Sequence, residues 1–67
     1  MQAEKKEWPE AVGKTVDEAK QLILADDVEI NVQVLLEGSP TTRDFRINRV
    51  RIFHNDKNIV VSVPRRG

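Results

Sequence analysis

The absence of cysteine constrains this chain more than any other feature of its sequence. The chain has 67 residues and no cysteine, and His54 is its one histidine. Domains below about 70–80 residues commonly need disulfides, a metal or unusually good packing. Disulfides and thiolate metal sites are excluded by composition, and so is a site built from several histidines. We therefore expect apolar packing and polar networks to hold the fold, with no metal and no cofactor.

The length allows one domain only. Residues 1–7 are polar and charged apart from Met1 and Ala3, and we expect them to form a flexible N-terminal segment. Residues 8–67 would then form the single domain, a monomer when free. Trp8 is the only tryptophan and precedes a proline, and we expect its ring to cover one edge of the core.

The charge balance argues against several classes of partner. The chain has 11 basic and 11 acidic residues, so its formal net charge is zero. That balance gives no long-range attraction to nucleic acid or to an anionic membrane. No apolar run approaches the roughly 20 residues that span a bilayer, and the first residues lack the apolar stretch of a signal peptide. We expect a soluble protein whose compartment stays open between cytoplasmic, vacuolar and extracellular.

A helix is predicted from Thr15 to about Ala25. Thr15 and Glu18 have the spacing of a capping box, in which each side chain bonds the other residue's backbone amide. One face of this segment is apolar at helical spacing, which we interpret as core because no second helix is expected to cover the sheet. The residues of that face are Val16, Ala19, Leu22 and Ile23.

Three strands are predicted after the helix. Residues 30–36 form the first, because apolar and polar residues alternate strictly from 30 to 34. Residues 47–54 form the second, and 59–63 the third, which we expect to run antiparallel to the second after a turn at 55–58. The expected core between helix and sheet comprises Leu22, Ile23, Val34, Val50 and Ile52.

The connection between the first two strands, residues 37–46, is long for so small a domain. Irregular loops of this length are commonly functional. Gly38 and Pro40 favour a sharp exit from the strand, and Thr41 and Thr42 favour extended backbone because they are β-branched. An extended loop that is anchored at both ends and presents Arg43 has the form of a protease substrate held in place.

The second strand supplies a means of holding this loop. Arg49 and Arg51 are two positions apart, so both point to one side of the strand, opposite Val50 and Ile52. We expect their guanidinium groups to fork onto the carboxylate of Asp44 and onto loop carbonyls. They would form exposed ion pairs that hold the loop from below.

These segments together resemble the potato inhibitor I family of serine-protease inhibitors, over nearly the whole chain. The resemblance implies an α+β fold, with one helix packed on a small mixed sheet and a binding loop that joins two parallel strands. The motifs that carry the resemblance are Trp8-Pro9-Glu10, Val12-Gly13-Lys14, Glu18-Ala19-Lys20, Glu37-Gly38-Ser39-Pro40, Thr42-Arg43-Asp44-Phe45-Arg46, Asn48-Arg49-Val50-Arg51 and Val63-Pro64-Arg65-Arg66-Gly67.

The resemblance also implies a role for individual residues. The reactive bond would be Arg43–Asp44, with Thr42 and Asp44 tethered from the second strand, and Phe45 on the leaving-group side together with Arg46. The protease-binding loop would comprise Gly38, Ser39, Pro40, Thr41, Thr42, Arg43, Asp44, Phe45 and Arg46. The residues expected to support it are Asn48, Arg49, Arg51 and Gly67, whose carboxylate would lie near the two arginines.

This sequence departs from the family pattern in three places. Arg43 stands where relatives often have methionine or leucine, and arginine suits the buried carboxylate at the base of a trypsin pocket. Trypsin-like enzymes are therefore the expected targets, with subtilisin- and chymotrypsin-like enzymes as the alternatives. Leu36 replaces a proline that several relatives carry at the loop entry, and Arg66 replaces an apolar residue near the C-terminus.

Three other functions compete with inhibition. The arginines at 43, 46, 49 and 51 form a basic cluster, but with zero net charge and only Phe45 available for stacking, nucleic-acid binding is not expected. An enzyme would need Ser39 or Ser62 with His54, in a domain too small to wall a catalytic pocket, so we expect no enzymatic activity. A generic interaction module with an idle loop is the third, and trypsin would cut such a loop rapidly.

Overall fold

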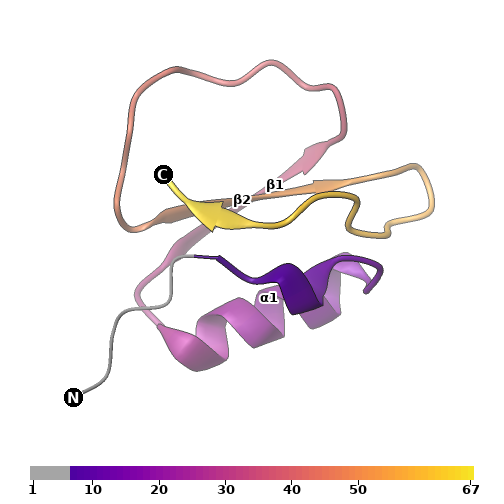
Figure 1. The fold of residues 1–67 in the computed structure, drawn as a ribbon, viewed down its shortest axis with the longest axis horizontal. Coiled ribbons are helices and arrows are strands. Elements are labelled where there is room, and N and C mark those ends of the chain that lie inside the picture. The colour runs from indigo at the N-terminus through magenta and orange to yellow at the C-terminus, as the bar shows by residue number, and fades with distance from the viewer. Residues whose placement is uncertain (1–6) are drawn as a thin grey trace.

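The computed structural model describes residues 7–67, which place a helix on one side of a small sheet and a long loop on the other (Figure 1). The short 3-10 helix η1 spans Pro9–Ala11 and the helix α1 spans Val16–Asp26. This is the α+β arrangement expected from the sequence. The strands are β1 at Asn31–Leu36, β2 at Arg49–His54 and β3 at Arg65–Arg66.

The expected flexible segment, residues 1–7, lies outside the described residues except for Glu7. Glu7 forms an isolated antiparallel bridge with Arg65. Its carboxylate lies 3.3 Å from Nε of Arg65. The described chain therefore begins beside β3.

The N-terminus of α1 confirms the predicted capping box. The amide of Glu18 donates to Oγ1 of Thr15 at 3.3 Å, and the amide of Thr15 donates to Oε1 of Glu18 at 3.2 Å. These bonds satisfy amides that have no partner inside the helix. Within residues 7–67 no helix has the length and apolarity that a membrane span requires.

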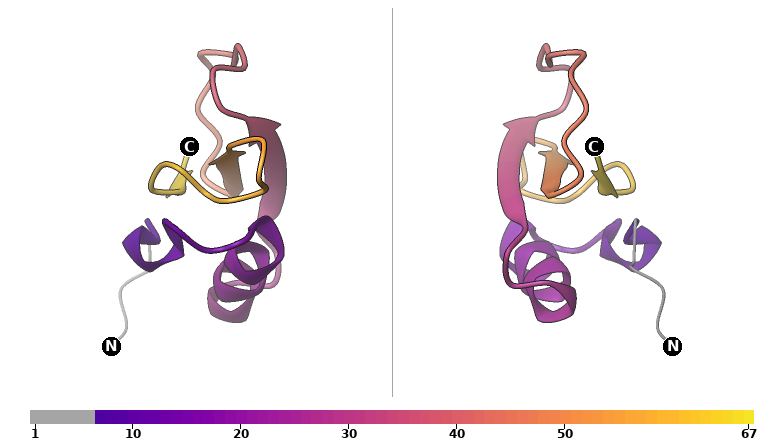
Figure 2. Two further views of the ribbon diagram at one scale, coloured as in Figure 1. Left: turned by 90° about the vertical axis from the view of Figure 1, so that its right-hand side faces the viewer. Right: turned by 90° about the vertical axis from the view of Figure 1, so that its left-hand side faces the viewer.

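The sheet has the order β1-β2-β3, with β1 parallel to β2 and β3 antiparallel to β2. Val32 lies opposite Val50, and Val34 lies opposite Ile52. Because two adjacent parallel strands need a connection that returns the chain to its starting end, the segment after β1 has to be long. Residues 37–48 make this return as an irregular loop, which projects from the sheet on the side away from α1 (Figure 2).

The prediction of a third strand over residues 59–63 is wrong. Val60 makes only an isolated bridge with His54, and its amide donates to Lys14 at 2.9 Å. The amide of Val61 donates to the carbonyl of Phe53 at 3.0 Å. The β-branched residues of this segment bond to two different neighbours, so they form no continuous ladder, and the third strand is Arg65–Arg66 instead.

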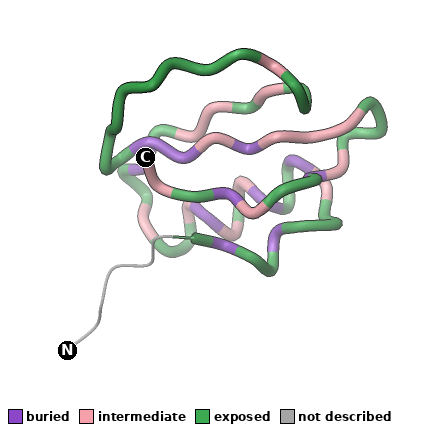
Figure 3. The backbone as a smooth tube through the Cα atoms, turned by 45° about the horizontal axis from the view of Figure 1, so that its top comes forward, coloured by how far each residue is buried: buried purple, intermediate pink, exposed green. Residues whose placement is uncertain are grey.

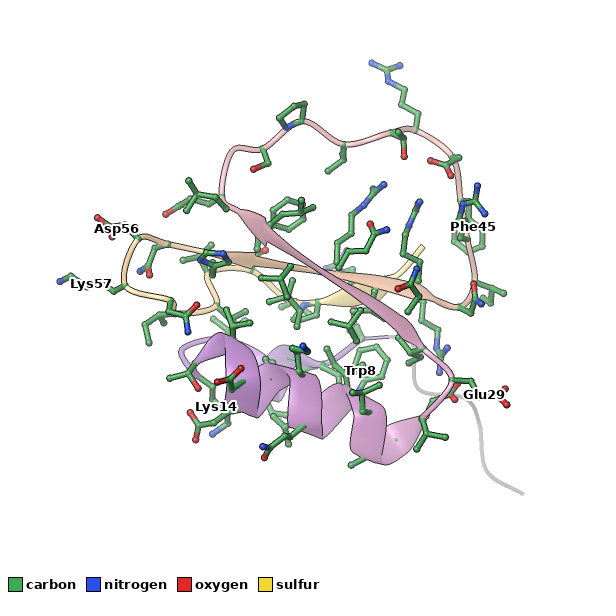
Figure 4. All side chains as sticks on the ribbon, turned by 180° about the vertical axis from the view of Figure 1, so that it is seen from behind. Trp8, Lys14, Glu29, Phe45, Asp56 and Lys57 are labelled. Atoms are coloured by element: carbon green, nitrogen blue, oxygen red, sulfur yellow. The ribbon has the colours of Figure 1, made fainter. Side chains whose placement is uncertain are left out.

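The core lies between α1, η1 and one face of β2. Trp8 is fully buried, and its Nε1 donates to Oδ2 of Asp26 at 2.7 Å, so it joins η1 to the end of α1 (Figure 4). Ile23, Val50 and Ile52 are also fully buried, as predicted. Among residues 7–67, the buried residues that form this hydrophobic cluster are Trp8, Ala11, Val16, Ala19, Ile23, Ile30, Val50, Ile52 and Val60.

Two members of the predicted core are placed differently. Val34 is 40% exposed, so its assignment to the core is wrong. It lies on β1, an edge strand, while α1 packs mainly on β2. Leu22 is only partly buried and packs against the outside of the core with Val32. The predicted start of the second strand at Ile47 is also early, because the amide of Arg49 closes a turn onto the carbonyl of Arg46 at 3.1 Å.

Candidate functional site

The loop of residues 37–48 is the most exposed continuous segment of the described chain (Figure 3). It leaves β1 through a turn in which Gly38 has a φ of +83°, a conformation that side-chain-bearing residues rarely adopt. The carbonyl of Leu36 accepts from the Ser39 amide at 3.0 Å and from its hydroxyl at 2.6 Å. Leu36 therefore enters the loop with its carbonyl fully engaged, although no proline fixes this position.

The loop returns to the sheet through the turn at residues 46–49. The main-chain oxygen of Asn48 accepts from the amide of Asn31 at 2.8 Å, which ties this foot of the loop to the start of β1. The side chain of Asn48 is exposed and makes no hydrogen bond to the loop in the part of the chain that is described. Any support from Asn48 in this structure is therefore a main-chain contact.

Arg49 holds the half of the loop that follows Arg43. Its Nη2 donates to the carbonyl of Asp44 at 2.7 Å, and its Nη1 lies 3.2 Å from Oδ2 of the same residue. Its Nε donates to the main-chain oxygen of Gly67 at 3.0 Å. One guanidinium group thus joins the loop to the C-terminal strand through three contacts.

Arg49 lies on the opposite side of β2 from the apolar core, as predicted, but it is not exposed. Only 4% of the residue is accessible to solvent. The loop and Gly67 cover it, because its side chain fills the space between them and the sheet. The expectation of an exposed ion pair is therefore wrong for Arg49. Its donors are largely shielded from solvent, and hydrogen bonds of charged groups are stronger in such an environment.

Arg51 holds the other half of the loop through Thr42. The predicted fork of this arginine onto the carboxylate of Asp44 is wrong, because within residues 7–67 that carboxylate pairs with Arg46 and Arg49 instead. Its Nη2 donates to Oγ1 of Thr42 at 2.8 Å, and its Nη1 lies 3.4 Å from the carbonyl of Thr42. The Thr42 hydroxyl in turn donates to Oδ1 of Asp44. A chain of hydrogen bonds thus runs from Arg51 through Thr42 to Asp44 and bridges both sides of the bond between Arg43 and Asp44.

The electrostatics of Asp44 follow from these partners. Its carboxylate accepts from the Thr42 hydroxyl, from Nε of Arg46 at 2.9 Å and from Arg49. The hydrogen bond from Thr42, followed by that from Arg46 and by the charge of Arg49, holds the pKa of Asp44 far below its usual range. The carboxylate therefore stays ionised, and able to accept from its partners, under all ordinary conditions.

Arg43 lies between these two tethered residues and is itself exposed. Within residues 7–67 its guanidinium group makes no hydrogen bond or ion pair, so its side chain is available to a partner. Phe45 is 71% exposed, and its ring lies against Gly67: a Cβ added at that glycine would be 3.0 Å from the ring. Arg43 and Phe45 thus present a cationic and an aromatic side chain on either side of Asp44.

Two of the residues considered for catalysis bond to main-chain carbonyls of neighbouring residues. The Ser39 hydroxyl donates to a main-chain carbonyl, and Nδ1 of His54 lies 2.7 Å from the carbonyl of Asn55. No group of three or more metal-ligating side chains that could hold an ion occurs across residues 7–67. What this site offers is an exposed peptide segment held in one conformation.

Sequence reasoning missed the partners of Arg66. The guanidinium group of Arg66 bonds to Asp27 and to the carbonyl of Ile47. Asp27 lies directly after α1 and Ile47 lies at the foot of the loop. The charge of Arg66 was the signal, but its partners are far away in the sequence, so only the tertiary structure identifies them.

Three comparisons place this chain among known proteins. The family model of the potato inhibitor I family matches residues 1–67. Eglin C of Hirudo medicinalis is 47% identical over 66 residues, which cover 97% of this chain and 94% of the relative. The wound-induced proteinase inhibitor 1 of Solanum tuberosum is 48% identical over 62 residues, and the matched part is 58% of that longer protein.

A solved structure agrees in fold as well as in sequence. The crystal structure of bitter gourd trypsin inhibitor superposes with a TM-score of 0.90 and 34% identity, over 97% of this chain and 96% of that one. The two chains therefore share one fold over nearly their whole length. The chain therefore belongs to the potato inhibitor I family, a family of protease inhibitors and not of enzymes.

Proposed function

We propose that this chain inhibits serine proteases by binding their active site in the manner of a substrate, with Arg43–Asp44 as the reactive bond. The observation that carries the proposal is the chain of hydrogen bonds across that bond. Thr42 and Asp44, which flank Arg43, are bonded to each other and to Arg51 and Arg49 of β2. The peptide on either side of the bond is thereby fixed to one rigid strand.

The proposed mechanism follows from this attachment. The loop enters the protease cleft as an extended strand and adds main-chain hydrogen bonds. Because the loop is already ordered by Arg49 and Arg51, little conformational entropy is lost when it binds. If the protease attacks the carbonyl of Arg43, the segment that begins at Asp44 stays held by Arg49, so the bond re-forms faster than water completes hydrolysis.

Arg43 directs the inhibitor to trypsin-like proteases under this proposal. Its guanidinium group is exposed and suits a pocket with a carboxylate at its base. One of the similar structures is itself a trypsin inhibitor by name. Phe45 would contact the protease on the leaving-group side, where its ring is held against Gly67.

A titration of trypsin, chymotrypsin and subtilisin with the parent and with Arg43→Leu tests this proposal. Trypsin should be the most tightly inhibited enzyme. The substitution should weaken inhibition of trypsin about thirtyfold or more, since truncating a buried interface anchor typically costs at least about 2 kcal/mol. Inhibition of chymotrypsin or subtilisin should improve in the same variant.

The matched control is Lys57→Leu, which removes another exposed basic residue. Lys57 lies in the turn at 55–58, at the opposite end of the molecule from Phe45 (Figure 4). Its substitution should leave inhibition of trypsin unchanged. Equal effects of the two substitutions, or no effect of either, would show that Arg43 does not occupy the specificity pocket.

A further inference from the structure

A further buried arginine, Arg66 of β3, lies at the end of the loop that returns to the sheet. Within residues 7–67, Arg66 contacts segments that are far apart in the sequence. Its Nη2 lies 3.2 Å from Oδ2 of Asp27, its Nη1 donates to the carbonyl of Ile47 at 3.3 Å, and its Cζ lies 5.6 Å from the centre of the Trp8 ring. These contacts join the segment after α1, the foot of the loop and the edge of the core.

Because the side chain of Arg66 is buried, its guanidinium group needs these contacts in place of water. Only 5% of its side chain is accessible to solvent. A buried guanidinium group is costly unless charged and polar partners satisfy it. Here a carboxylate, a carbonyl and an aromatic face take up its donors and its charge.

Arg66 also directly precedes Gly67, the residue to which Arg49 is bonded. It pairs with Val50 across the sheet, and the next residue, Gly67, donates from its amide to the carbonyl of Arg49 at 2.9 Å. The oxygen of Gly67 then accepts from Nε of Arg49, and its Cα lies beneath the ring of Phe45. A shift of β3 would therefore move both the Arg49 clamp and the exposed ring.

We propose that Arg66 is a positioning residue for the protease-binding loop. It fixes the end of the loop at Ile47, on the leaving-group side. Through Gly67 it also fixes the positions of Arg49 and Phe45. This inference rests on the proposed function. Arg66 acts at a distance from the reactive bond and touches no protease. Its effect is to keep the segment after Asp44 in place, so that a cut loop remains aligned for religation.

The test compares Arg66→Met, Arg66→Lys and the parent. Methionine keeps an apolar stem of similar length against Trp8 but has no donors, and lysine keeps the charge but cannot reach Asp27 and Ile47 with one fork. The first measurement is backbone ¹⁵N relaxation of the free protein at residues 44–48, with α1 as the internal reference. The second is the equilibrium ratio of cut to intact inhibitor in the presence of a catalytic amount of trypsin. It is approached once from the intact form and once from the cut form, and mass spectrometry measures it.

Arg66→Met should increase the motion of residues 44–48 without changing that of α1. It should raise the ratio of cut to intact chain about fivefold, the factor for one lost hydrogen bond, and Arg66→Lys should give a smaller rise. The control is Arg65→Met, since Arg65 is the exposed neighbour that pairs with Glu7. It should match the parent in both measurements.

A purely structural role for Arg66 gives a different result. In that case Arg66→Met melts at a lower temperature while the loop relaxation and the cut-to-intact ratio stay at the parent values, which overturns the inference. Failure of both Arg66 variants to fold also overturns it, because Arg66 would then determine the fold. If the parent is hydrolysed as an ordinary substrate, the proposed function has failed, and the relaxation measurement still decides whether Arg66 orders the loop.

Discussion

The two faces of β2 differ in chemistry although they belong to one strand. Val50 and Ile52 point toward α1 and are fully buried in apolar surroundings. Arg49 and Arg51 point the other way and bond to the loop. One face therefore contributes to folding mainly through apolar burial, and the other arranges the loop through hydrogen bonds to charged groups.

The comparison teaches that stability and inhibition are only partly separable in this domain. Arg51 contacts the loop at exposed positions. Arg49, by contrast, is as inaccessible as the core residues and also bonds Gly67. The face that supports the loop thus contains one arginine that serves the loop alone and one that also joins the C-terminal strand to the sheet.

The largest effect is expected on the apolar face. Ile52→Ala should lower the free energy of unfolding by about 2–5 kcal/mol, because it empties a fully buried site. Thermal and denaturant melts measure this loss. In so small a domain it is enough to unfold a large fraction of the molecules. Val34→Ala is the matched control on the facing register position of β1, and it should cost much less because Val34 is 40% exposed. Similar losses for both substitutions would contradict the placement of the core.

A smaller effect, and an unequal one, is expected on the loop face. Arg49→Ala should cost about 1–3 kcal/mol of stability, because it removes three bonds of a buried guanidinium group. Oδ2 of Asp44 keeps its bond to Arg46, whereas the main-chain oxygens of Asp44 and Gly67 lose this donor. Arg51→Ala should cost less, about 1 kcal/mol, because its two bonds to Thr42 are open to solvent. Denaturant melts of the two variants measure the difference.

Both substitutions should nevertheless convert the protein toward a substrate of trypsin. Cutting between Arg43 and Asp44 should be faster than in the parent, and mass spectrometry over a time course reports its site and rate. Arg51→Ala separates the two properties most clearly, since it should be cut faster while its melt stays close to that of the parent. If it resists cutting as well as the parent does, the rigidity of the loop comes from its own sequence and not from β2.

The smallest effect concerns pH. The pKa of Asp44 is lowered in the folded protein, chiefly by the hydrogen bond from Thr42. A group whose folded pKa is depressed stabilises the fold above its unfolded pKa, about 3.9 for aspartate, and loses that contribution only as pH falls through the folded value. The clamp should therefore remain intact at a pH where ordinary aspartates are already protonated.

A ¹³C titration of the Asp44 carboxyl group measures this directly. Its midpoint should lie well below that of an ordinary aspartate, and Thr42→Val should raise it, because valine has no hydroxyl to donate. A midpoint at the ordinary value in the parent would mean that the bonds to Asp44 do not persist in solution. In that event the loop is less ordered than the contacts on either side of the Arg43–Asp44 bond indicate.

Elements that depend on local rules were predictable from the amino-acid sequence alone. The capping box of Thr15 and Glu18 predicted the start of α1, because its two bonds lie within one turn of helix. The two-residue periodicity of β2 predicted which side chains are buried and that Arg49 and Arg51 point to the opposite side. The motifs of residues 37–51 also identified the family, since they keep the loop and its tethering arginines together in one short stretch.

Features that depend on distant partners could not be predicted, because they follow from how the segments pack together. Residues 59–63 have strand-forming side chains, yet their amides bond to Lys14, Phe53 and Asn55, so no ladder forms. Val34 alternates as a core residue, but it lies on an edge strand that α1 does not fully cover. Arg49 and Arg66 are buried because the loop, Gly67 and Trp8 close over them. Burial of a charge is a property of all the segments around it, so the periodicity of one strand cannot specify it.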